Sequence, residues 1–138
     1  YNSINEFALE NVMDKAQSLN VDVVSKDEDA ENKHLILKVN DYEASNTLGS
    51  PSWCISTRES YFKSYTRGEN EQYFIYDFTK SAKDNDSMLG ITLDSKGGVD
   101  SMHYKDDRMV IDEITSDYWR DVINEKTQVK PRQTMKNK

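Results

Sequence analysis

Cys54 is the residue of this sequence best suited to nucleophilic chemistry, and it lies in the segment GSPSWCISTRESYF between Gly49 and Phe62. A cysteine becomes a nucleophile when a histidine or a helix N-terminus lowers the pKa of its thiol and a carboxylate orients the histidine. His103 and Asp100 can fill these two roles, because both lie in one predicted strand downstream. Cys54, His103 and Asp100 are therefore the hypothetical catalytic residues of a cysteine-dependent enzyme.

The same segment also has a purely structural interpretation. Cysteine is among the residues most often buried, and Trp53-Cys54-Ile55 has the composition of an apolar triplet that anchors a loop in the core. We favour this interpretation. It predicts that Cys54 is buried and unreactive, and that Cys54→Ser destabilises the fold, because a hydroxyl costs more to bury than a thiol.

Arg58 gives the segment a second kind of chemistry. Together with Ser56 and Thr57, it can bind a phosphate or a carboxylate at the start of a helix. A hydroxyl that caps the helix and an arginine that faces solvent explain the same residues, and we favour that explanation.

We expect neither a metal nor a cofactor. His34 and His103 are isolated in the sequence and Cys54 has no second cysteine, so the spacing of a zinc site is missing. The acidic runs at 27–31 and 84–88 lack the glycine and the final glutamate of a calcium loop. No phosphate-binding glycine loop or dinucleotide motif is present either.

The elements that position these residues follow from hydrophobic periodicity. Two helices are predicted near the chain ends, over 3–19 and 116–126, and the second presents Tyr118, Trp119, Val122 and Ile123. Strands are predicted at 34–39, 73–78, 87–93 and 99–104. The last three form an antiparallel β-meander, so the predicted fold class is α+β, with the meander packed against an N-terminal and a C-terminal helix.

The segments between these elements are less regular. Residues 25–33 are charged and are predicted to form an exposed loop. Residues 42–48 form either an irregular connection or a short helix that ends at Gly49. Residues 58–66 are predicted to be a helix capped by Thr57, and Thr115 or Ser116 is expected to cap the C-terminal helix.

The composition limits the class of protein. A chain of 138 residues can bury one core, and we expect a single α+β domain over 1–126 and a basic, flexible tail or linker over 127–138. No apolar run approaches the roughly 18 residues of a membrane helix. We therefore expect no membrane partner. The single cysteine allows no internal disulfide, so we expect a cytoplasmic protein.

Charge is distributed unevenly along the chain. The net charge is −7, and residues 125–138 carry +4, which leaves −11 for residues 1–124. Because a body this acidic repels phosphate backbones, we expect no nucleic acid to bind through the folded part. A protein partner with a basic surface is the better match.

One stretch resembles a known group of proteins. The sequence GSPSWCIST, followed by an aromatic helix, a turn with glycine and the strand YFIYDF, is similar to a Gly-x-x-x-Trp-Cys-Thr-type box in uncharacterised phage and mobile-element proteins. The similarity covers about residues 49–108 and departs from the pattern at Ile55. It implies a phage-encoded protein, located in the host cytoplasm or the virion, and it implies no catalytic role for any residue.

Two functions remain open on this evidence. The first is a small acidic protein-binding module that engages a host or virion protein. Its candidate binding residues are Tyr42, Tyr65, Glu69, Asp106, Asp107 and Arg58. The alternative is the cysteine-dependent enzyme that uses Cys54 with His103. We favour the binding module, because it agrees with the charge and with the lack of catalytic motifs.

Overall fold

The structure, a computed structural model, describes the backbone of residues 2–136 and the side chains of residues 8–127. Within this part of the chain, five antiparallel strands form one sheet in the order β1-β2-β3-β4-β5. Their bounds are β1 (Val21–Asp27), β2 (His34–Val39), β3 (Glu71–Asp77), β4 (Met88–Leu93) and β5 (Val99–Tyr104). The helices are α1 (Asn2–Ala16), α2 (Tyr42–Leu48), α3 (Cys54–Thr57), α4 (Glu59–Tyr65) and α5 (Glu113–Lys136), with a 3₁₀ turn η1 (Asn85–Ser87). The predicted α+β class and the β-meander are confirmed.

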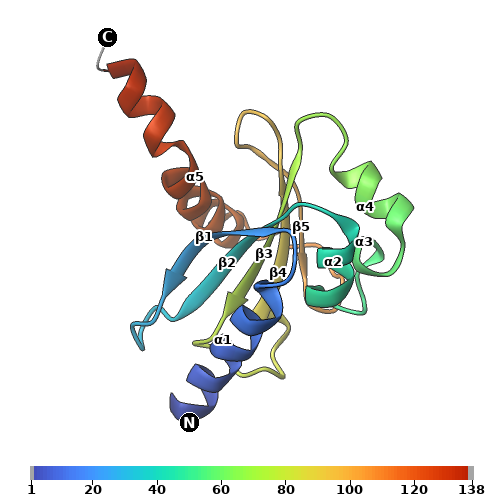
Figure 1. Cartoon of the computed structure of the whole chain (residues 1–138), viewed down its shortest axis with the longest axis vertical. Helices are drawn as coiled ribbons and strands as arrows, with labels where there is room; N and C mark the ends of the chain where they lie inside the picture. The colour runs from blue at the N-terminus through green and yellow to red at the C-terminus, as the bar shows by residue number, and fades with distance from the viewer. Residues whose placement is uncertain (1, 137–138) are drawn as a thin grey trace.

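Helices cover both faces of the sheet. Side chains alternate between the two faces along each strand, so each face presents its own set of apolar residues to the helices. On the first face, β2 and β3 pack against α1, α2, α3 and α4 through Leu9, Ala16, Leu35, Leu37, Val39, Ala44, Leu48, Trp53, Ile55, Phe62, Phe74 and Tyr76. On the second face, α5 packs against the sheet through Ile36, Tyr73, Ile75, Leu89, Ile91, Leu93, Met102, Trp119 and Ile123. In Figure 1, α2, α3 and α4 lie together on one side of the molecule and α5 leaves on the other.

The region predicted as an exposed loop over 25–33 begins inside a strand. β1 continues to Asp27 and pairs with β2 across a register shift between Val23 and Ser25. Ser25 and His34 are buried against each other, with 2.8 Å between the serine Oγ and the histidine Nε2. A polar pair that satisfies its own hydrogen bonds inside a sheet has no apolar periodicity, so the sequence pattern does not indicate it.

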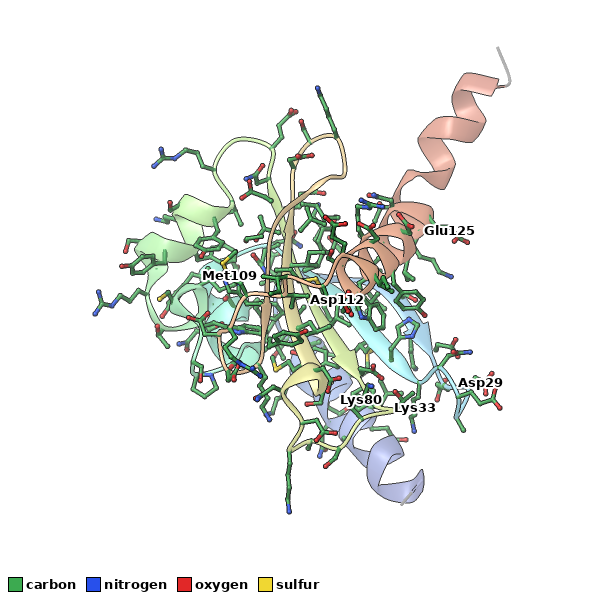
Figure 2. All side chains as sticks on the ribbon, turned by 180° about the vertical axis from the view of Figure 1, so that it is seen from behind. Asp29, Lys33, Lys80, Met109, Asp112 and Glu125 are labelled. Carbon is green, nitrogen blue, oxygen red and sulfur yellow. The ribbon has the colours of Figure 1, made fainter. Side chains whose placement is uncertain are left out.

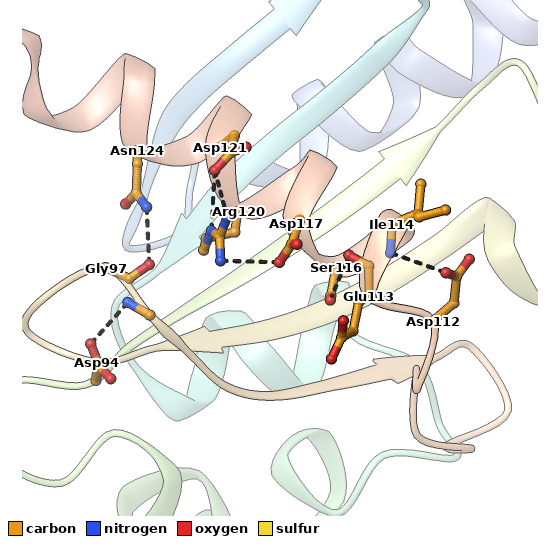
Figure 3. Close-up of polar contacts among 11 residues, drawn as sticks. Asp94, Gly97, Asp112, Glu113, Ile114, Ser116, Asp117, Arg120, Asp121 and Asn124 are labelled. Atoms are coloured by element: carbon orange, nitrogen blue, oxygen red, sulfur yellow. Dashed lines mark hydrogen bonds and ion pairs between the residues drawn. The ribbon is translucent and has the colours of Figure 1, made fainter.

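The helix α5 begins before either predicted cap. Asp112 occupies the N-cap position: one of its carboxylate oxygens accepts a hydrogen bond from the Ile114 backbone N–H at 3.0 Å and the other from the Thr115 hydroxyl at 2.8 Å. Figure 3 shows the first of these contacts. The helical backbone runs on to Lys136, through most of the segment predicted as a tail. Residues 137 and 138 lie outside the described residues.

Two short helices fix the backbone around Cys54: α2 precedes the Cys54 segment and α3 begins at Cys54 itself. The helical alternative for 42–48 is confirmed: Asp41 caps the Ala44 N–H and the Gly49 N–H donates to the Ser45 carbonyl. Thr57 is not a helix cap, because it belongs to α3, where its hydroxyl bonds the Trp53 carbonyl at 3.2 Å.

Candidate functional site

Cys54 lies at the surface, whereas its two neighbours, Trp53 and Ile55, are buried. The prediction that Cys54 is buried is therefore wrong. The physical reason is the single helical turn of α3, which rotates each successive side chain by about a third of a turn. Because Ile55 and Ser56 face the core, Cys54 faces solvent.

Polar contacts fix the orientation of α3. The Ser45 hydroxyl of α2 donates to the Ile55 carbonyl at 2.7 Å, and the Asn46 amide donates to the Ser56 carbonyl at 2.8 Å. Gly49 permits this close packing, because a Cβ there would lie 1.8 Å from the Ser56 hydroxyl oxygen. The glycine of the Gly-x-x-x-Trp-Cys segment therefore has a steric role.

Trp53 attaches the segment to the sheet. Its indole N–H donates to the Tyr104 carbonyl at 2.8 Å, and its ring lies 5.1 Å from that of Phe74. The ring also covers Gly90, where a Cβ would come within 3.2 Å of the indole. A glycine inside a strand often marks a close approach of this kind.

A cavity of about 60 Å³ lies beside Trp53 on the first face of the sheet. It is lined by Trp53, Cys54, Ile55, Tyr65, Gln72, Gly90, Thr92, His103 and Asp107. The structure thus places Cys54 and His103 at one cavity, as the catalytic hypothesis requires. Within the described part of the chain, no hydrogen bond joins the cysteine sulfur to the imidazole.

Asp100 is not among the residues that line this cavity, and the nearby carboxylate is that of Asp107. β4 and β5 pair in regular register as far as Thr92 and Ser101. The register then shifts, so that Leu93 lies opposite Val99. Asp100 is the unpaired residue of this irregularity, and its side chain is exposed.

Asp107 has an uncommon backbone conformation. Its φ is 75°, in the left-handed region that costs a non-glycine residue energy, and its N–H donates to the Tyr104 carbonyl at 2.9 Å. Burial, followed by the negative charge of Asp107, raises the pKa of the Tyr65 hydroxyl above its ordinary value. Tyr65, which lines the cavity, therefore carries no charge at neutral pH.

Sequence reasoning missed the polar side of the cavity. The Thr92 hydroxyl donates to the Gln72 side-chain oxygen at 2.6 Å, and both residues are buried. Ser101, the cross-strand partner of Thr92, has a buried hydroxyl oxygen without a hydrogen-bond partner. Polar residues at alternate positions of a strand usually indicate a face exposed to solvent, so the pattern hid this buried cluster. Gly90 is the sequence signal that could have revealed it, since a glycine inside a strand often marks the close approach of another element.

The predicted binding residues are dispersed over several elements. Tyr42 and Tyr65 are half-buried and pack against the core of the first face. Glu69 is exposed, and Arg58 places its guanidinium 5.9 Å from the Tyr61 ring centre. Asp106 is exposed and its carboxylate pairs with the Arg108 guanidinium at 2.7 Å.

A second surface feature was not predicted. Between β5 and the second turn of α5, four large apolar side chains face solvent: Met109 (62% exposed), Ile111 (88%), Ile114 (82%) and Tyr118 (53%). We call these four residues the 109–118 patch. The sequence analysis assigned Tyr118 to the same helix face as Trp119, but only Trp119 is buried. Figure 2 labels Met109 and Asp112 on the segment that leads into α5.

Among the described residues, no cluster of three histidine, cysteine or acidic side chains has the geometry to hold a metal ion. Across that same part of the chain, none of the helices has the length and apolar character needed to span a membrane. Comparison of the chain with protein-family models, with curated proteins and with solved structures found no match.

Proposed function

We propose that this protein is a protein-binding module whose contact surface is the 109–118 patch. The observation that carries the proposal is the exposure of its apolar side chains. Of the six large apolar residues exposed in the described chain, four belong to the patch. Single exposed apolar residues are ordinary, but a group of them on one segment is typical of an interaction site.

The charges around the patch indicate the type of partner. Residues 106–121 contain six acids and two arginines. Both arginines already pair with acidic residues. Arg108 pairs with Asp106. Figure 3 shows that Arg120 pairs with Asp117 and Asp121. A rim of net negative charge around apolar contacts favours a partner with a basic rim, and it increases the rate of association at low salt. Asp106 and Asp107 thus remain predicted contacts.

The experiment compares charge insertion inside and outside the patch. A partner recovered from a lysate of the source cell is titrated against the wild-type chain, the double variant Ile111→Lys/Ile114→Lys, and Val23→Lys. Val23 is a matched control, because it is a large apolar residue exposed on β1, outside the patch. We expect the double variant to bind at least tenfold more weakly and the control to bind normally. Equal binding by all three proteins contradicts the proposal.

A second candidate function is a cysteine-dependent enzyme that uses Cys54 with His103. The supporting observation is that both residues line one cavity together with a carboxylate, Asp107. In this version Asp107 takes the orienting role first given to Asp100.

Alkylation by iodoacetamide tests the second candidate. An imidazole that activates the thiol makes Cys54 react faster than free cysteine near pH 6, and His103→Ala or Asp107→Asn lowers that rate. Asp100→Asn serves as the control and leaves the rate unchanged. A Cys54 that reacts at the rate of free cysteine in all these variants excludes the enzyme.

The location and origin belong to the proposal as well. The resemblance of residues 49–108 to a box in phage and mobile-element proteins supports a phage-encoded module. Its partner is then a host or virion protein, and its site of action is the host cytoplasm or the virion.

A further inference from the structure

A groove of about 300 Å³ borders the 109–118 patch, between the first turns of α5 and the β3–β4 connection. Its apolar residues come from two depths. Leu89 of β4 and Trp119 of α5 are buried and form the floor, whereas Ile114 and Tyr118 are exposed and form one wall. Ile114 and Tyr118 are four residues apart on one helix, so they lie on the same face. The groove is therefore an apolar recess that opens directly onto the patch.

The floor of the groove is held rigidly. The Trp119 ring meets the Tyr118 ring edge-on at 4.9 Å and the His34 ring edge-on at 5.5 Å. His34 is itself fixed, because its Nδ1–H donates to the Asn32 carbonyl at 2.7 Å and its Nε2 accepts from the Ser25 hydroxyl. A recess whose floor is already held in place costs less conformational entropy when a side chain enters it.

The wall opposite α5 is charged. It consists of Asp77, Lys80 and Asp86, and the Lys80 amine lies 3.4 Å from the Asp86 carboxylate. One carboxylate oxygen of Asp77 accepts hydrogen bonds from the Thr79 N–H at 3.0 Å and from the Thr79 hydroxyl at 2.5 Å, but among the described residues Asp77 has no ion-pair partner. Figure 2 shows Lys80 at this end of the sheet. One carboxylate beside the apolar floor is thus available to a cation.

We infer that the groove binds one large apolar side chain of a partner segment in which a lysine or arginine adjoins that side chain. The apolar residue covers Leu89 and Trp119, and the cation pairs with Asp77. The size of the recess suits a single leucine, phenylalanine or tryptophan better than a whole helix face. A second copy of this chain is a poor occupant, because the protein carries a net charge of −7. The inference rests on the proposed function and specifies its partner.

The test begins with a library of random twelve-residue peptides displayed on phage and selected against the full chain. We expect the enriched peptides to share a large apolar residue next to lysine or arginine. One such peptide, made with a fluorescent label, is then titrated against purified variants by anisotropy. Ile114→Lys and Asp77→Lys alter the groove, and Ile111→Lys alters the patch outside it. Thermal melts check that each variant is folded, which the exposure of Ile111 and Ile114 favours.

We expect both groove variants to weaken binding at least tenfold and Ile111→Lys to weaken it less. Nuclear magnetic resonance supplies an internal control: the indole N–H signal of Trp119 shifts on peptide addition, and that of Trp53, on the other face of the sheet, does not. Loss of binding with Ile111→Lys alone retains the patch as contact surface but overturns the groove inference. Binding that all three variants leave unchanged overturns the groove and the proposed function together. If the selected peptides do not share a large apolar residue next to lysine or arginine, the groove inference is also overturned.

Discussion

Trp53 links the helices on the first face to β5, the last strand of the sheet. Its N–H bonds the end of β5, and its ring packs on Phe74 and over Gly90. The residue thus holds α3, and with it Cys54, in position beside the cavity.

Trp53→Ala is expected to cost roughly 3 to 5 kcal/mol of unfolding free energy, the range for emptying a large buried aromatic site. Urea unfolding followed by circular dichroism measures it. Cys54→Ser is the matched control: because Cys54 is exposed, its substitution should change stability by no more than about 0.5 kcal/mol. A larger loss for Cys54→Ser than for Trp53→Ala would restore the buried cysteine of the sequence prediction.

At Asp107 the backbone conformation and the carboxylate can be tested separately. Both Asp107→Gly and Asp107→Ala remove the carboxylate, but only glycine adopts a φ of 75° without a steric penalty. We expect the glycine variant to be more stable than the alanine variant by about 1 kcal/mol, as measured by thermal or urea unfolding. Equal stability of the two variants would show that this φ places no strain on the loop.

At the scale of elements, the contact between β2 and β3 includes a charged group that responds to pH. The Glu71 carboxylate lies 2.7 Å from the Lys38 amine and accepts a hydrogen bond from the Tyr73 hydroxyl at 2.8 Å. Partial burial acts to raise the pKa of the Glu71 carboxyl, but the hydrogen bonds from Lys38 and Tyr73 and the lysine charge hold that pKa below its ordinary value of 4.5.

A lowered pKa in the folded state means that ionised Glu71 stabilises the fold above the unfolded pKa and that this stabilisation is lost as the pH falls. The wild type should therefore exceed Glu71→Gln in stability at pH 7, and the difference should shrink as the pH drops below about 4.5. Urea midpoints measured between pH 7 and pH 3 check this. Glu59→Gln is the control, since Glu59 forms an exposed pair with Lys63. A difference that grows toward pH 3 would reverse the sign and contradict the assignment.

The strands of the meander were predictable because their apolar and aromatic residues are distinctive in sequence. The ends of elements were less so. Ser25 and His34 extend β1 and β2 through a polar pair, and Asp112 begins α5 before any apolar residue. Cys54 and His103 line one cavity, as the alternative catalytic hypothesis supposed, and their catalytic role stays a prediction. Asp100 lies outside the lining because an irregular strand pairing displaces it, whereas Asp107, a residue with left-handed backbone, lies within the lining. The 109–118 patch was missed because an exposed isoleucine has the same periodicity as a buried one.

At the scale of the whole molecule, the acidic body should exclude nucleic acid. A chain that lacks residues 127–138 is expected to show no binding to duplex DNA at about 150 mM salt, because residues 1–124 carry −11. The full chain, with five basic residues after Glu125, should show at most a weak affinity that falls steeply with salt. Fluorescence anisotropy with a labelled duplex measures both. Tight binding by the truncated chain would contradict the protein-partner proposal.

The strand order β1-β2-β3-β4-β5 also has a consequence for synthesis on the ribosome. Every strand pairs with its neighbour in sequence, so the β1–β2, β3–β4 and β4–β5 hairpins can each close soon after they emerge, whereas β2 must wait for α2, α3 and α4 before it meets β3. The two faces, however, are completed at different times. The helices of the first face precede β3, whereas α5, the cover of the second face, is translated last. A nascent chain paused before Glu113 therefore presents Ile75, Leu89 and Ile91 to solvent, and this interval is when the protein most needs a chaperone.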